Sequence, residues 1–152
     1  MVLLGNTANF MPITAQGLWE IEDFQYLESL VQRHAACSGE CLWREGSRDN
    51  RMGLVLHGHV KLLKETENPG HPLILGIFGP GSLVIDFAFF NGALAETSAF
   101  AVDDLEIAYL SKRQFDEIQK EHPSLGNRVY SKALSSISDQ LKHAYKRLEV
   151  FF

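Results

Sequence analysis

The sequence predicts a mainly β fold, a small β-barrel or jelly roll with short flanking helices and a long C-terminal helix. Three observations point to this class. Short apolar runs separated by glycine-containing turns extend from Leu42 to Leu110. Helical periodicity precedes them over residues 18–33 and returns after Ser111. The 152 residues are enough for one domain with its own hydrophobic core.

The composition is typical of a soluble globular domain, with 45% hydrophobic and 22% charged residues. No apolar run reaches the roughly 18 residues that a membrane span needs, and the N-terminus lacks the features of a signal peptide. We therefore expect a cytoplasmic protein that does not contact membranes. The net charge of −5 argues against nucleic-acid binding by this domain, because such binding needs a basic face.

The order of elements follows from periodicity and turn signals. Apolar residues recur at helical spacing over residues 18–33, which predicts one or two short amphipathic helices. A further helix is expected after Ser111, which can form a capping box with Gln114, and Pro123 ends or bends it. Strands are expected at Cys41–Arg44, Gly53–Leu56, His59–Lys64, Leu73–Phe78, Leu83–Val84, Ser98–Ala101 and Leu105–Leu110.

The final helix, from about Ser124 to the C-terminus, carries a heptad pattern. Its apolar positions follow alternating steps of three and four residues: Leu134, Ile137, Leu141, Ala144, Leu148 and Phe151. We expect the β core to be complete before this helix begins, so that a partner helix is needed to cover the stripe. The pattern therefore predicts a homodimer through the C-terminal helix, with packing inside one chain as the alternative.

An ordered set of glycines resembles a known family. Gly39-Glu40 precedes a strand, Glu45-Gly46 follows it, Gly58 lies within the hairpin sequence VLHGHVKL, and Pro80-Gly81 comes later. Together with the helices, the set is similar, over roughly Ile21 to Phe152, to the cyclic-nucleotide-binding domain of Crp/Fnr-type bacterial regulators. The resemblance implies a β-roll of the double-stranded β-helix type with flanking helices over 18–121. It also implies an N-terminal segment, 1–17, before the β-roll and a dimerisation helix, 122–152, after it.

The resemblance also implies a phosphate-binding cassette within Pro80–Ala101. Asp86 stands where the family places a glutamate, and we expect its carboxylate to accept a hydrogen bond from a sugar hydroxyl. Glu96 aligns with the family's phosphate-binding arginine, so a carboxylate would face the phosphate where a cation is needed. The candidate ligand-binding residues are Gly81, Ser82, Ile85, Asp86, Phe87, Ala88, Glu96, Thr97, Ser98 and, from the final helix, Gln140.

A shifted alignment would not supply the missing cation either, because no Lys or Arg lies between Lys64 and Lys112. We therefore expect an effector other than ordinary cAMP. Genuine cAMP or cGMP binding through an atypical cassette, with backbone N–H groups holding the anion, stays open as an alternative. The aromatic residues around the cassette predict either core packing or an enlarged apolar pocket for a non-nucleotide ligand: Phe87, Phe89, Phe90 and Phe100.

A cupin-like metal enzyme is a second alternative. His57 and His59 could ligate a metal from a strand, but a third ligand is poorly placed, and we expect surface histidines in a turn. His71 is similarly expected to be exposed rather than a haem ligand. Cys37 and Cys41 are too few for a disulfide framework and are expected to pack at a strand entry.

The sequence thus predicts a non-enzymatic, ligand-sensing regulatory domain that signals through its C-terminal helix. It contains no nucleophile elbow and no Walker-type loop. Phe152 falls where the family's hinge would begin, so we expect either the sensor part of a transcription regulator or a free-standing domain. In the former, DNA would be contacted only through a helix-turn-helix that lies outside these residues. The effector is unknown, and haem or a metal is not expected.

Overall fold

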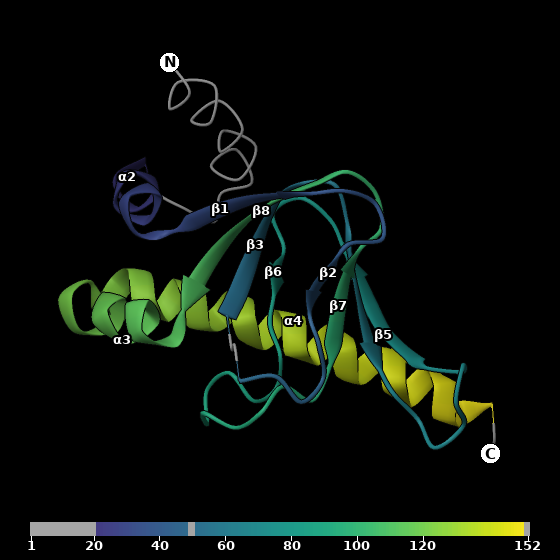
Figure 1. Ribbon diagram of the computed structural model, residues 1–152. Coiled ribbons are helices and arrows are strands. Elements are labelled where there is room, and N and C mark those ends of the chain that lie inside the picture. Colours follow the sequence, from purple (N-terminus) through teal and green to yellow (C-terminus); the bar gives the residue numbers. More distant parts are fainter. Residues whose placement is uncertain (1–20, 49–50, 151–152) are drawn as a thin grey trace.

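The computed structural model describes residues 21–48 and 51–150, which fold into two antiparallel sheets, two short helices and one long helix (Figure 1). The strands are β1 (Gln32–Ala36), β2 (Cys41–Trp43), β3 (Arg51–His57), β4 (Val60–Lys64), β5 (Leu73–Phe78), β6 (Leu83–Val84), β7 (Ser98–Ala101) and β8 (Leu105–Ser111). One sheet has the order β1-β8-β3-β6 and the other β2-β7-β4-β5. Neighbouring strands are often distant in sequence, which is the jelly-roll plan, so the predicted fold class is confirmed.

Every strand expected from the sequence is present, with ends shifted by two residues at most. The hairpin between β3 and β4 turns at Gly58, whose φ is +83°. A Cβ at this position would lie 2.3 Å from the carbonyl oxygen of Asp104, so only glycine fits the close approach of the two turns. The glycine pattern therefore marks positions that the backbone path requires.

Strand β1 corrects the predicted helix over 18–33. Within that range the structure describes α2 (Ile21–Leu30), and Gln32 and Arg33 already belong to β1. The strand pairs along its whole length with β8, and the Arg33 guanidinium donates to Glu106 at 2.5 Å. Pairing with a strand that is distant in sequence overrides the local helical periodicity here.

The helix α3 (Lys112–Glu121) begins at the predicted capping box. The Gln114 N–H donates to Ser111 Oγ at 3.1 Å, and the Ser111 N–H donates to Gln114 Oε1 at 2.9 Å. The Gln114 side-chain amide also donates to the Leu30 carbonyl at 2.6 Å, at the end of α2. The cap therefore fixes α3 against both β8 and α2.

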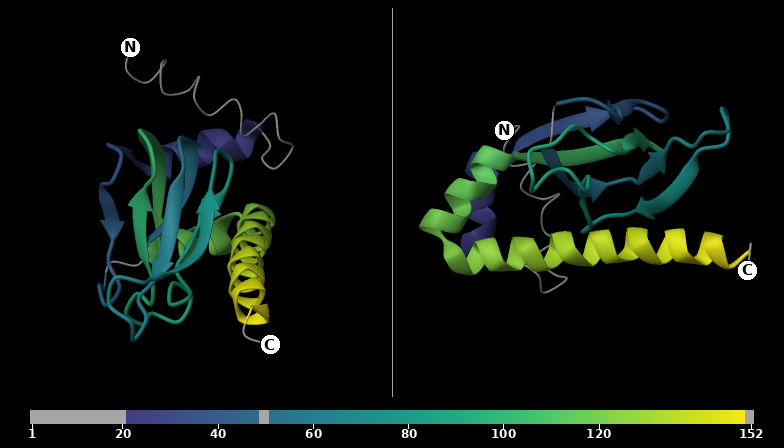
Figure 2. Two further views of the ribbon diagram at one scale, coloured as in Figure 1. Left: turned by 90° about the vertical axis from the view of Figure 1, so that its right-hand side faces the viewer. Right: turned by 90° about the horizontal axis from the view of Figure 1, so that it is seen from below.

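The long helix α4 (Pro123–Glu149) runs along one side of the β-roll, with α3 folded back beside its start (Figure 2). Its residues Leu125, Val129 and Ala133 are buried in a core cluster with α2, β3 and β8. The expectation that the core is complete without this helix is therefore wrong, since one face of α4 closes it. None of the described helices has the length and apolarity that a membrane crossing requires.

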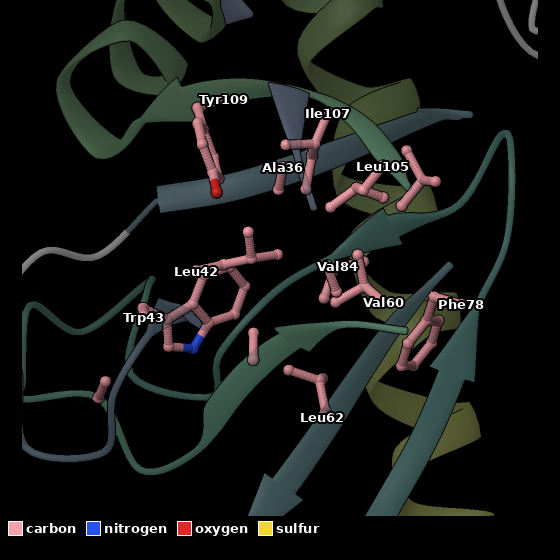
Figure 3. Close-up of a cluster of buried hydrophobic side chains, with 14 of the residues drawn as sticks. Ala36, Leu42, Trp43, Val60, Leu62, Phe78, Val84, Leu105, Ile107 and Tyr109 are labelled. Atoms are coloured by element: carbon pink, nitrogen blue, oxygen red, sulfur yellow. The ribbon is translucent and has the colours of Figure 1, made fainter. Parts of the chain in front are cut away.

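A second core cluster lies between the two sheets (Figure 3). Trp43 from β2 and Tyr109 from β8 are its largest side chains, and Val60 and Leu62 point into it from β4. Val84 belongs to this cluster, whereas Leu83 and Ile85 belong to the other. β6 and the residue after it therefore contribute to both cores, within the first part of the cassette.

Candidate functional site

The cassette starts at a tight turn that is fixed to β3. Gly81 is buried, has a φ of +88°, and donates its N–H to the Val55 carbonyl at 2.8 Å. The Val55 N–H donates in turn to the Ser82 carbonyl at 2.9 Å. The turn thus places β6 beside β3 at the edge of its sheet, where β6 contacts α4.

Residues 87–92 of the cassette form a series of turns. The Phe89 N–H closes the first turn by donating to the Asp86 carbonyl at 3.1 Å, and the Phe89 ring is fully buried in the core. Phe87 points the other way and is 36% exposed, while Ala88 is buried. Phe89 therefore fills the interior of the cassette, which favours core packing over an enlarged pocket at this residue.

Asp86 is the buried acid of the site, with only 2% of its surface exposed. Its carboxylate accepts hydrogen bonds from the backbone N–H groups of Ala88 at 2.9 Å, Glu96 at 3.1 Å and Thr97 at 2.8 Å. The Thr97 hydroxyl donates to the same carboxylate. A sugar hydroxyl would have to compete with these four donors for the predicted hydrogen bond.

The other side chains of the cassette divide between solvent and the interior. Glu96 is exposed, whereas its backbone N–H is turned inward to Asp86. Thr97 is fully buried, and Ser98 Oγ accepts the Glu45 N–H at 2.9 Å. The hydroxyls expected to serve a ligand are therefore both engaged within the protein.

Gln140, the candidate ligand-binding residue from the final helix, connects α4 to the cassette. It is fully buried, and its side-chain amide donates to the Ile85 carbonyl at 3.0 Å. In the part of the chain that the structure describes, neither Gln140 Oε1 nor the buried Ser136 Oγ meets a hydrogen-bond partner. Two buried polar side-chain oxygens on one face of α4 are thus without a hydrogen-bond partner beside the cassette.

A small cavity of about 40 Å³ lies between the cassette turn and α4. Ser82 contributes to it from the cassette, and Ser136, Asp139 and Lys132 contribute from α4. Lys132 was not predicted as a cassette neighbour, because it lies far from the cassette along the chain. Its position on α4, two turns before Gln140 and therefore on a similar face of the helix, is the feature of the sequence that points to it.

The residues considered for metal binding lie at the surface of the β-roll. The His59 ring forms a 2.7 Å hydrogen bond with Asp103, and this bond lowers the Asp103 pKa below its ordinary value. His57 is exposed at the end of β3, and His71 lines an open groove of about 650 Å³ near the end of α4. Over residues 21–48 and 51–150, no His, Cys, Asp and Glu side chains form a group of three that could hold a metal.

Both cysteines are free thiols. Cys37 is exposed and Cys41 is half-buried, with its Sγ 3.4 Å from the Trp43 carbonyl oxygen. The expected packing role therefore fits Cys41 better than Cys37.

The predicted dimer seam is divided between two faces of α4. Leu134, Leu141 and Leu148 are 65%, 52% and 51% exposed. Ile137 and Ala144 are partly buried against the chain's own two cores, and Phe151 lies outside the described residues. Two tyrosines extend the exposed stripe, which consists of Tyr130, Leu134, Leu141, Tyr145 and Leu148.

Comparison with known protein families matches residues 33–122 to the family described as cyclic nucleotide-binding domain. The chain belongs to this family. The match begins in β1 and ends after α3, so it contains the whole β-roll and the cassette. The resemblance seen in the ordered glycines is therefore confirmed.

Solved structures show the same fold for this cyclic nucleotide-binding domain. A cyclic nucleotide-binding domain from Methylobacillus flagellatus aligns with a TM-score of 0.75 and 25% identity, over 88% of this chain and 75% of that one. The catabolite activator protein of Thermus thermophilus aligns with a TM-score of 0.70 and 21% identity, over 87% of this chain and 60% of that one. The Crp/Fnr-type architecture predicted from the sequence is thus present.

The cyclic nucleotide-binding domain also resembles segments of much longer proteins. Patatin-like phospholipase domain-containing protein 6 of Homo sapiens is 30% identical over 108 residues, which is 71% of this chain but 8% of that protein. The chain spans a similarly small share, 6 to 7%, of the fungal lysophospholipases that it matches. This similarity therefore covers only a small part of each of those proteins.

Proposed function

We propose that the chain is a non-catalytic sensor domain of Crp/Fnr type, whose effector is not ordinary cAMP and whose output is a change in the packing of α4. It belongs either to a transcription regulator or to a homologue that signals by protein contact. The family and the fold support the sensor role. The choice of effector rests on the cassette.

The observation that carries the proposal is the charge of the cassette. Its inward N–H groups at Ala88, Glu96 and Thr97 already bind the Asp86 carboxylate. No Lys or Arg occurs between Lys64 and Lys112. A cyclic phosphate would lack a bidentate cation and would face carboxylates, which repel it.

Lys132 does not restore the missing cation. It shares its small cavity with Asp139, whose negative charge opposes its own, and that cavity of about 40 Å³ is far smaller than a nucleotide site, which is typically about 300 Å³ or more. The unpartnered oxygens of Ser136 and Gln140 instead favour a ligand that donates hydrogen bonds.

The hydrogen bond from Gln140 to the Ile85 carbonyl supports α4 as the output element. Ile85 directly precedes Asp86, so a ligand that moves the cassette backbone also strains or breaks the bond to α4. A ligand that binds the two arrangements of this contact with different affinity shifts the population between them. The exposed stripe of α4 supports a homodimer that transmits the shift, because Tyr130, Leu134 and Leu141 leave a large apolar area in water.

Isothermal titration calorimetry of the full chain with cAMP and with cGMP tests the proposed effector class. We expect no saturable heat at millimolar nucleotide. A dissociation constant in the micromolar range would contradict the proposal and would favour genuine cyclic-nucleotide binding through an atypical cassette, the second candidate, which the family match supports.

A further inference from the structure

We propose that the Asp86 carboxylate is a built-in anion that occupies the cassette's own anion-binding site. This inference deepens the proposed function and rests on it, since it names what fills the place that a cyclic phosphate would need. It assigns to the cassette a latent site for a small carboxylate, which appears when the Asp86 side chain is removed.

The site is built from four donors on two segments. The Ala88 N–H lies just after Asp86, while the Glu96 N–H and both the N–H and the hydroxyl of Thr97 come from 10 and 11 residues further along the chain. The Glu96 N–H is shared between both carboxylate oxygens, 3.1 Å from each. Backbone N–H groups that converge in this way form a concave anion-binding site without any cation.

Burial distinguishes this arrangement from an ordinary turn at the surface. Asp86 is 2% exposed and Thr97 is fully buried, so water does not replace the carboxylate as the partner of these donors. Converging donors without an acceptor would be costly in such a place, because buried N–H groups need partners. The fold therefore requires an anion here, and the chain supplies it itself.

The Asp86 carboxylate determines which effectors can reach these donors. An anionic effector can reach these donors only if the Asp86 side chain leaves them. An uncharged effector can bind beside the cassette, next to Gln140 Oε1, and leave Asp86 in place. The Asp86 carboxylate thus excludes the phosphate group of a cyclic nucleotide from these donors.

Chemical rescue of Asp86→Ala tests the proposal. The substitution removes a carboxylate of the size of formate. We expect the melting temperature to fall by roughly 5–10 °C, because several charge-assisted hydrogen bonds are lost. Sodium formate should restore most of the loss in a saturable way, as expected for a ligand that binds only the folded state, whereas sodium chloride at equal ionic strength should not.

Asp104→Ala is the matched control, since Asp104 is an exposed carboxylate in the turn between β7 and β8. Its melting temperature should respond equally to formate and to chloride, as should that of the unchanged protein. An Asp86→Ala protein that is as stable as wild type, or that formate stabilises no more than chloride, would overturn the proposal.

If Asp86→Ala does not fold, hydrogen exchange on the wild-type protein tests the proposal instead. The amides of Ala88, Glu96 and Thr97 should exchange slowly compared with those of Gly92 and Leu94, which are exposed in the same loop. Equal exchange in the two groups would rule out a carboxylate-filled site.

The proposal and the proposed function fail in different ways. Micromolar cAMP binding by the unchanged protein, together with formate rescue of Asp86→Ala, would reject the effector class but keep the internal anion. Absent rescue, together with absent cAMP binding, would reject the internal anion and keep the proposed effector class.

Discussion

Buried polar residues decide what the cassette can bind. A buried polar group is costly unless it is hydrogen-bonded, and the Asp86 carboxylate accepts hydrogen bonds from the Thr97 hydroxyl and from three backbone N–H groups. The sequence identified these residues as cassette members, because the pattern of Pro80-Gly81 locates the loop. It did not reveal that they bind each other, since their contact spans 11 residues and depends on the loop path.

Thr97→Val removes only the hydroxyl from this network. Valine has nearly the same shape, so the expected loss of about 1.5–3 kcal/mol in the free energy of unfolding reports the bond to the charged carboxylate, together with the 3.5 Å bond that the hydroxyl accepts from the Trp43 indole N–H. Chemical denaturation measures it. Thr66→Val provides the control, because the Thr66 hydroxyl makes its bonds in an exposed loop, and its loss should cost about 1 kcal/mol or less. Equal losses at the two positions would argue against a special role for Thr97.

The bond between the His59 ring and Asp103 predicts how stability depends on pH. This bond lowers the Asp103 pKa in the folded state, so the carboxylate stabilises the fold above its unfolded pKa. The contribution is lost as the pH falls through the folded pKa. Thermal melts between pH 7 and pH 3, a range that spans the ordinary aspartate pKa of about 3.9, should therefore show a smaller acid-induced loss for Asp103→Asn than for wild type.

The adjacent, exposed Asp104→Asn controls for the loss of a surface charge. An Asp103→Asn protein whose melting temperature falls with acid as steeply as that of wild type would contradict the assignment.

At the scale of elements, local signals were predictable and long-range ones were not. The capping box of α3 lies within four consecutive residues, and both of its hydrogen bonds are present as predicted. Strand β1 was missed because its sequence, QRHAA, has no apolar alternation and most of its residues are exposed. Its strand conformation comes from pairing with β8, about seventy residues away along the chain.

Ser111→Ala tests the contribution of the cap to α3. Removal of an N-cap hydroxyl costs about 0.5–2 kcal/mol, and we expect the upper part of this range because the Gln114 side chain also holds α2 through Leu30. Urea denaturation gives the value, with Ser131→Ala on the exposed side of α4 as the control. A loss no larger than that of the control would show that the cap is dispensable.

At the scale of the whole molecule, α4 has one face buried in the core and one face exposed. One face closes the core through Leu125, Val129 and Ala133. This packing was not predicted, because the β core was expected to be complete without the helix. The opposite face leaves only Leu134, Leu141 and Leu148 exposed among the described residues of the predicted seam. Periodicity shows that a helix has an apolar stripe, but only the packed fold shows how much of it the chain itself covers.

Sedimentation velocity tests the homodimer. We expect the wild-type chain to sediment at twice its monomer mass, and Leu134→Glu with Leu141→Glu to sediment as a folded monomer, because two charges would be buried in the seam. Lys142→Glu, an exposed change on the same helix, should leave the dimer intact. A monomeric wild-type protein at micromolar concentration would contradict the dimer.

The cassette itself gives the most direct test of the effector class. In a two-dimensional NMR titration of the wild-type chain with cAMP, the amide signals of Ala88, Glu96 and Thr97 report on the donors that a cyclic phosphate would need. We expect these three signals to stay unchanged up to millimolar nucleotide, because the Asp86 carboxylate holds the donors. Saturable shifts of the same three signals at micromolar cAMP would contradict this, since they would show that the nucleotide displaces Asp86.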